Sequence, residues 1–175
     1  EFKKWYGNQE YVVNWENDGD EIRNFIDDKG KQRSRPQNTD FYFQESVSWS
    51  RITSSVNSFR YYPQGFIFDQ SGHSLFTENN SVKRCLMGYL NNKFSAFILN
   101  TLNPTMNLEV GYLKEIPYPS NESNFDLKVV NTLIDISKSD WNSYETSWDF
   151  TTLPLLQSNY HQPTIQATYS QLRSH

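Results

Sequence analysis

The chain has 175 residues, enough for one packed domain with a smaller appendage. Aromatic residues make up 16% of it, so large rings are expected to supply much of the buried area. The mean hydropathy of -0.76, with no apolar run of about 18 residues, argues against a membrane span.

The net charge is -4, but the charges are segregated along the chain. The stretch from residue 29 to residue 60 holds six basic residues and two acidic ones, a local charge of +4. Segregation of this kind places a basic face on an acidic protein and keeps nucleic acid open as a partner.

The single cysteine, Cys85, cannot form an internal disulfide and fits a reducing cytoplasm. Because no secretory leader is visible, we expect a cytoplasmic protein. Cys85 falls among apolar residues of a predicted helix and is expected to be a small core side chain. The first residue is Glu1 in place of Met, which favours a piece of a longer protein.

The first half of the chain is predicted to be mostly β. Residues 10–15 are β-branched and aromatic and indicate a strand, and a short helix capped by acids should end at Phe25. Residues 27–38 have the composition of a basic loop. Further strands are expected at residues 41–43, 47–49, 58–62 and 66–69, with turns at 63–65 and 70–72.

The second half changes to a helical period. Apolar residues recur at steps of three and four from Val82 to Leu102, which predicts one helix over about residues 81–102, with Ser81 as its N-cap and Asn103-Pro104 as its end. A strand over 108–116, a helix over about 125–138 and an irregular segment from Ser139 should follow. The predicted class is α+β: a small curved mixed or antiparallel sheet packed against these two helices. Residues 1–138 would form the domain, and residues 139–175 an aromatic and polar extension.

The sequence lacks the motifs of a catalyst. His73, His161 and His175 have no spacing suited to a metal, and there is neither a nucleophile elbow nor a glycine-rich phosphate loop. The segment Asn103-Pro104-Thr105-Met106 lacks the second proline and the aromatic residue with which amino-methyltransferases hold a target base. We therefore expect no catalytic residue, metal or cofactor in this chain, and interpret Asn103-Pro104 as a helix end.

A basic loop that precedes aromatic strands favours contact with DNA, since closely spaced cations attract phosphates and arginine can also pair with guanine. The candidate residues are Lys29, Lys31, Arg33, Arg35, Trp49, Arg51, Arg60 and Lys93. A solubilising loop beside a core of aromatic residues is the plain alternative. A carbohydrate-binding module is a further one, suggested by the Trp, Tyr and Asn content.

Several stretches share their order with one protein family. They are Lys4–Asn8, Tyr11–Gly19, Arg33–Asn38, Gly65–Asp69, Gly88–Lys93, Lys114–Pro117, Asp140-Trp141 and Glu145–Phe150. Over about residues 3–156 the chain resembles the region after the catalytic domain of BREX phage-resistance adenine methyltransferases (PglX-like). Leu90-Asn91-Asn92-Lys93, with Asn in place of Ser, is also similar to the helix of TaqI-like specificity domains and of type I restriction specificity subunits.

The resemblance implies a target recognition domain for double-stranded DNA. A catalytic domain elsewhere in the polypeptide would bind S-adenosylmethionine and methylate adenine N6 on a flipped base, while this chain reads flanking bases. Lys29, Lys31, Arg33 and Arg35 would contact the backbone, and Arg51 and Arg60 would lie nearer the bases. Trp49 would be either a wedge or a core ring.

Besides DNA and the catalytic domain, other subunits of the defence system are possible partners. In that alternative the chain is a protein-interaction module, and the aromatic segment from Asp140 to Phe150 is its contact surface.

Overall fold

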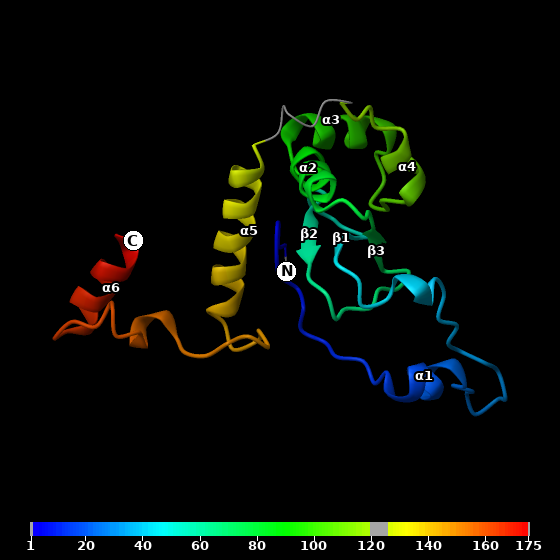
Figure 1. Cartoon of the computed structure of the whole chain (residues 1–175), viewed down its shortest axis with the longest axis horizontal. Coiled ribbons are helices and arrows are strands. Elements are labelled where there is room, and N and C mark those ends of the chain that lie inside the picture. The colour runs from blue at the N-terminus through cyan, green and yellow to red at the C-terminus, as the bar shows by residue number, and fades with distance from the viewer. Residues whose placement is uncertain (1, 120–125, 175) are drawn as a thin grey trace.

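The computed structural model describes residues 2–119 and 126–174. Its elements, in chain order, are α1 (Glu16–Arg23), η1 (Thr39–Phe41), β1 (Ser46–Ser50), β2 (Phe59–Tyr62), β3 (Gly72–Leu75), α2 (Asn80–Leu90), α3 (Lys93–Leu102), α4 (Val110–Lys114), α5 (Leu127–Asn142), η3 (Pro154–Leu156) and α6 (Ile165–Arg173). A small sheet lies at the centre, with α2, α3 and α4 at one end of it and α1 beyond the other (Figure 1). The α+β class is confirmed.

The sheet is antiparallel, in the order β2-β1-β3. Ser48 of the central strand lies opposite Arg60 on one side and Ser74 on the other. Side chains alternate between the two faces of a strand, and the sequence of β1 alternates in the same way. Val47 and Trp49 therefore enter the hydrophobic core, whereas the serines of β1 lie on the opposite, polar face.

The N-terminal residues pair with the outer edge of β2 and so widen the sheet. Trp5 forms a parallel bridge there: its N–H donates to the Phe59 carbonyl at 3.2 Å, and its carbonyl accepts from the Tyr61 N–H at 2.8 Å. The strand predicted at residues 10–15 is wrong. These residues pair with no described strand, and Tyr11 is 90% exposed. Their composition favours a strand, but a strand also needs a neighbour to pair with, and none of the described strands is one.

Helix α2 packs on β1 and β2, and α5 packs on α2. The buried core draws on the sheet, on α2 and α3, and on α5. Cys85 is 1% exposed on α2, which confirms its place in the core. The core residues are Tyr6, Val47, Trp49, Phe59, Met87, Tyr89, Leu90, Leu99, Leu108, Ile116, Val130, Ile134 and Trp141.

The predicted single helix over 81–102 is two helices, α2 and α3, that meet at Asn91-Asn92. The Asn92 side chain caps α3 by accepting from the Ser95 N–H at 2.8 Å. The predicted cap of α2 was two residues too late, because Asn79, not Ser81, accepts from the first amides of the helix.

Several shorter predictions also need correction. Residues 41–43 form η1 and a turn, in which Phe43 has a positive φ of 64° and bonds the backbone of Gly65 and Phe66, so neither 41–43 nor 66–69 is a strand. The third strand, β3, begins at the predicted turn residue Gly72. The strand predicted at 108–116 contains the short helix α4. The predicted α5 is confirmed from Leu127 and continues to Asn142, while its expected start at residue 125 lies outside the described residues.

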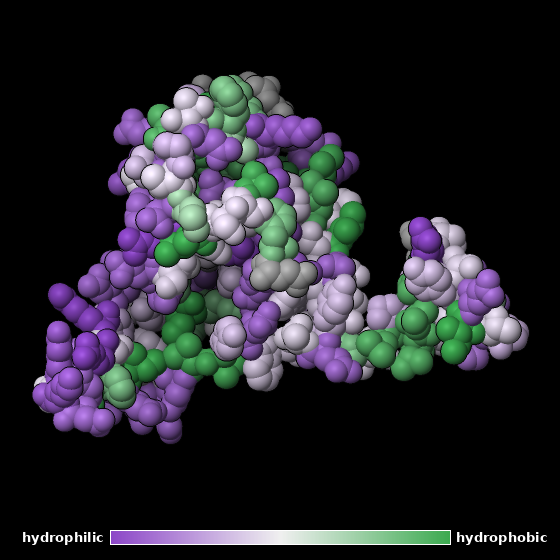
Figure 2. Space-filling model, turned by 180° about the vertical axis from the view of Figure 1, so that it is seen from behind, coloured by the Kyte–Doolittle hydropathy of each residue, from purple (hydrophilic) through white to green (hydrophobic). Residues whose placement is uncertain are grey.

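The C-terminal segment leaves the body as an arm (Figure 1). It holds η3 and α6, which pack on each other, so the expectation of wholly irregular structure after Ser139 is wrong. Thr164 caps α6 by accepting from the Ala167 N–H. The arm exposes several large side chains: Leu153, Leu155, Leu156, Ile165 and Tyr169. Figure 2 shows hydrophobic (green) atoms gathered on the arm, away from the body.

Candidate nucleic-acid interface

The basic loop at residues 27–38 is organised around the carboxylate of Asp27. Its Oδ1 accepts from the backbone N–H groups of Lys29 and Lys31 at 3.0 and 2.9 Å, and its Oδ2 lies 2.6 Å from Arg33 Nε. The Lys31 amide and then the Arg33 side chain hold the pKa of Asp27 below its ordinary value. With a backbone bridge between Ile26 and Gln32, these bonds fix a hairpin-like turn.

This turn presents cations to solvent. Lys29, Lys31 and Arg35 are exposed, and no ion pair joins any of them to another residue that the structure describes. Arg33 is also exposed, but its charge is shared with Asp27. The loop lies with α1 at the far end of the molecule from the C-terminal arm, in the strongly hydrophilic lobe of Figure 2.

An aromatic cluster joins this lobe to the body. The Trp15 ring meets that of Tyr42 edge-on at 5.0 Å, and the Arg23 guanidinium lies 5.5 Å from the Trp15 ring. Arg23 also pairs with Asp18 at 3.0 Å. Its charge is thereby partly neutralised, and the exposed cations of the lobe that have no ion-pair partner in the described structure lie on the turn.

Arg51 lies elsewhere, directly after β1. Its Nε is 2.7 Å from Glu109 Oε1, and the other oxygen of that carboxylate is 3.5 Å from His73 Nε2. Arg51 is half-buried. Its ion pair with Glu109 therefore ties the end of β1 to the residue before α4.

Arg60 is 5% exposed and lies within the sheet. Its guanidinium donates to neutral groups, namely Ser50 Oγ at 2.9 Å, Ser58 Oγ at 3.3 Å and the Lys3 carbonyl. A side chain so enclosed cannot reach a base edge without opening the sheet. The predicted role of Arg60 close to the bases conflicts with this burial.

Trp49 is a core ring. It is 2% exposed, its indole N–H donates to the Leu108 carbonyl at 3.1 Å, and its ring packs on Phe59 at 5.8 Å. A wedge that enters a base stack must be exposed. Of the two interpretations of Trp49, the structure agrees with the core ring.

Lys93 is exposed at the start of α3, at the opposite end of the body from α1 (Figure 1). The eight candidates therefore do not form one continuous rim. Lys29, Lys31, Arg33 and Arg35 share the loop between α1 and η1, whereas Arg51, Arg60 and Lys93 lie on or beside other elements.

The segment from Asn103 to Asn107, whose sequence lacks the residues of a base-binding turn, is closed by internal bonds. The Asn103 amide donates to the Asn107 carbonyl, and its oxygen accepts from the N–H and hydroxyl of Thr105 at 3.1 and 2.6 Å. Asn103 follows directly after α3, as its interpretation as a helix end requires. Within residues 2–119 and 126–174, no three His, Cys, Asp or Glu side chains gather in a way that could hold a metal.

Sequence reasoning did not find a concavity on the polar face of the sheet. Its floor is formed by Ser46, Ser48 and Ser74, with Gly72 beside them. The alternation of serine with Val47 and Trp49 in β1 was the available signal, since it assigns the serines to the face away from the core. In the described part of the chain, no helix has the length and apolar character needed to cross a bilayer.

No protein-family model matches this sequence. The chain is 38% identical over 174 residues to the adenine-specific methyltransferase PglX of Lacticaseibacillus casei (strain Zhang) and 36% identical over 172 residues to the adenine-specific methyltransferase BrxX of Escherichia coli O9:H4 (strain HS). Each match covers 97% of this chain but only 14% and 13% of the respective relative. The resemblance to this group of methyltransferases is confirmed: nearly the whole chain is homologous to one segment of adenine-specific methyltransferases of the PglX and BrxX kind.

Proposed function

We propose that this chain is a double-stranded DNA recognition module of an adenine-N6 methyltransferase in a phage-defence system. The observation that carries the proposal is the protruding turn with Lys29, Lys31 and Arg35 exposed and not ion-paired within the described structure. Cations held close together on a fixed turn suit successive phosphates, because each contact releases condensed counterions. Homology to adenine-specific methyltransferases supplies the context.

The chain itself would not transfer a methyl group. The internal bonding of Asn103 leaves its amide unable to hold a target base. S-adenosylmethionine and the flipped adenine would be bound by another part of the polypeptide, and this module would set the position of the duplex.

The test is binding of a fluorescent duplex by the 175-residue chain, followed by anisotropy at several salt concentrations. Three phosphate contacts predict a slope of log affinity against log salt of about -2 to -3. Replacing Lys29, Lys31 and Arg35 with alanine should weaken binding at low salt by about tenfold or more and flatten that slope.

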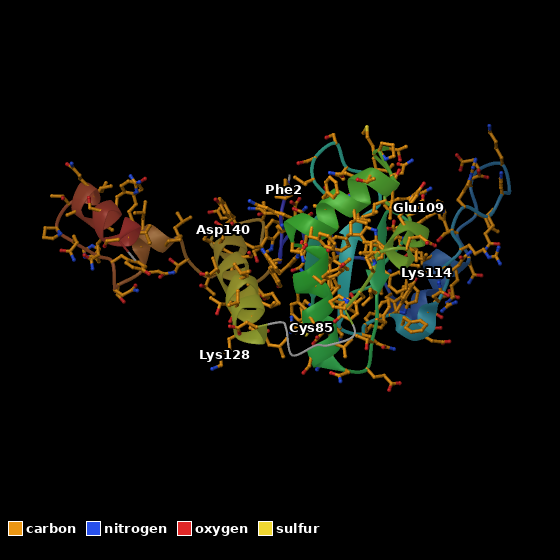
Figure 3. The ribbon with its side chains drawn as sticks, turned by 90° about the horizontal axis from the view of Figure 1, so that it is seen from above. Phe2, Cys85, Glu109, Lys114, Lys128 and Asp140 are labelled. Carbon is orange, nitrogen blue, oxygen red and sulfur yellow. The ribbon has the colours of Figure 1, made fainter. Side chains whose placement is uncertain are left out.

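A matched control removes the same charges elsewhere. Lys128, Lys138 and Arg173 also comprise two lysines and one arginine, and they lie on α5 and α6, on the far side from α1 (Figure 3 marks Lys128). Their triple alanine variant should bind as the wild type does. If both triple variants lost the same amount of DNA affinity, net charge alone would explain the effect, and the proposed role of the turn would be wrong.

A second candidate is a docking module for other subunits, favoured by the exposed apolar arm and by Trp148, which is 69% exposed. The predicted contact segment from Asp140 to Phe150 is only partly available, because Trp141 is buried in the core. Replacing Leu155, Leu156 and Ile165 with serine should therefore abolish subunit capture and leave DNA binding intact, whereas loss of DNA binding alone would contradict this alternative.

A further inference from the structure

The polar face of the sheet carries a concavity of about 330 Å³. Its floor is made of small residues, Ser46, Ser48, Gly72 and Ser74, whose short side chains leave room above the strands. Ser48 uses its hydroxyl to donate to the His73 carbonyl at 2.9 Å. The floor is therefore a fixed surface with hydroxyl groups rather than an apolar one.

Aromatic rings form part of the wall. Tyr62 and Phe66 meet edge-on at 5.2 Å, and Phe68 is fixed against Tyr42 by a second edge-on contact, also at 5.2 Å. These contacts hold the rings in position before any ligand arrives. Ring faces attract cations and also stack on planar groups.

The charge of the lining has one sign. Glu10 and Asp69 line the concavity, and none of the lining residues is Lys, Arg or His, as far as the structure describes the chain. Asp69 Oδ1 accepts from the backbone N–H groups of Ser71 and Gly72 at 2.8 and 2.9 Å, which orients the carboxylate. The two carboxylates of the lining repel phosphate and favour a cation.

From this geometry we infer that the concavity binds an arginine side chain presented by another polypeptide segment. A guanidinium is planar, so it stacks on the rings, and its five N–H donors suit carboxylate and hydroxyl acceptors. This site is acidic, and it shares no residue with the cationic turn that we propose to contact DNA. Either proposal can therefore fail without the other.

The experiment is a titration of the ¹⁵N-labelled chain, followed by amide chemical shifts, with Nα-acetyl-arginine amide. The matched ligand is Nα-acetyl-citrulline amide, which has nearly the same shape without the charge. Saturable shifts should be confined to the lining residues, and the citrulline compound should bind about tenfold more weakly or not at all.

The protein variants separate charge from fold. Glu10→Gln with Asp69→Asn removes both charges and keeps an acceptor oxygen for the Ser71 and Gly72 amides, and it should weaken the arginine compound about tenfold. Glu78→Gln with Asp135→Asn changes two exposed acids outside the lining and should have no effect. Equal binding of citrulline, an unaffected Glu10/Asp69 variant, or preferential binding of deoxynucleosides would each overturn the inference.

Discussion

The side-chain amide of Asn91 makes two hydrogen bonds to the backbone of Phe59. Its Nδ2 donates to the Phe59 carbonyl at 2.9 Å, and its Oδ1 accepts from the Phe59 N–H at 3.0 Å. The amide thereby pairs with β2 as a neighbouring strand would. Both residues are buried, so these bonds connect the end of α2 to the sheet away from water.

Asn91→Ala should lower the free energy of unfolding by about 1–3 kcal/mol, because it leaves the buried N–H of Phe59 without its partner. The Phe59 carbonyl loses one of two bonds and keeps the one from the Trp5 N–H. Urea unfolding measures the change. The control is Asn100→Ala, at an exposed position of α3, where the change should stay within about 0.5 kcal/mol. Similar small effects for both variants would contradict the proposed weight of the Asn91–Phe59 pair.

Two helical glycines should respond to alanine in opposite directions. A Cβ at Gly88 would lie 2.8 Å from Val130 Cγ2, between α2 and α5, whereas one at Gly111 would meet nothing within 4 Å. Gly88→Ala should therefore destabilise the fold by about 1–3 kcal/mol, and Gly111→Ala should stabilise it by up to about 1 kcal/mol.

Thermal or urea unfolding decides between these outcomes. Val130→Ala removes the methyl group that the new Cβ would strike, so its combination with Gly88→Ala should cost less than the sum of the two single changes. Additive losses would show that the clash is relieved elsewhere.

Burial raises the pKa of the Tyr6 phenol to about 12, and the negative charge of Asp149 adds to the effect. Between pH 10 and pH 12 the phenol ionises in the unfolded chain but stays protonated in the folded one. The unfolded state is favoured as protons leave, so stability should fall across this window, by up to about 2–3 kcal/mol.

Comparison of the wild type with Tyr6→Phe isolates this contribution from the other tyrosines. The variant should lose less stability between pH 10 and pH 12, and the tyrosinate absorbance of the folded wild type should include one group that titrates near pH 12. Identical pH profiles of the two proteins would refute the assignment.

Trp49→Phe should separate stability from DNA binding. It removes the bond to the Leu108 carbonyl and leaves space in the core, at a cost of about 1–3 kcal/mol. A core ring touches no DNA, so the affinity of the folded variant for a duplex should change by less than about twofold. A large loss of affinity in a variant that remains folded would restore the wedge interpretation.

The helices were predictable because their apolar period is strong, but the break between α2 and α3 was not. The period runs through Asn91 and Asn92 without interruption, and it is the tertiary pairing of Asn91 with Phe59 that ends the first helix there. The opposite error occurred at residues 10–15, where strand-type residues have no neighbouring strand. Pairing between distant segments decides both cases, and local sequence does not contain it.

In the candidate site, too, some features could be predicted from local sequence and others depend on tertiary pairing. Composition alone identified the basic turn, because an apolar-free stretch with Gly30 and Pro36 has to be a loop. Composition could not tell that Arg60 lies inside the sheet, since that depends on its position opposite Ser48. The strict alternation around Trp49 did contain the information that this ring faces the core.

The C-terminal arm, whose elements η3 and α6 pack on each other, should be less stable than the rest of the molecule. Because η3 and α6 rest chiefly on each other, their loss removes little of the core around Trp49 and Leu99. Heating should melt this outlying piece first, and a protease should trim it while the sheet and its helices survive. The exchange of amide hydrogens would then be fast in α6 and slow in β1, within one and the same chain.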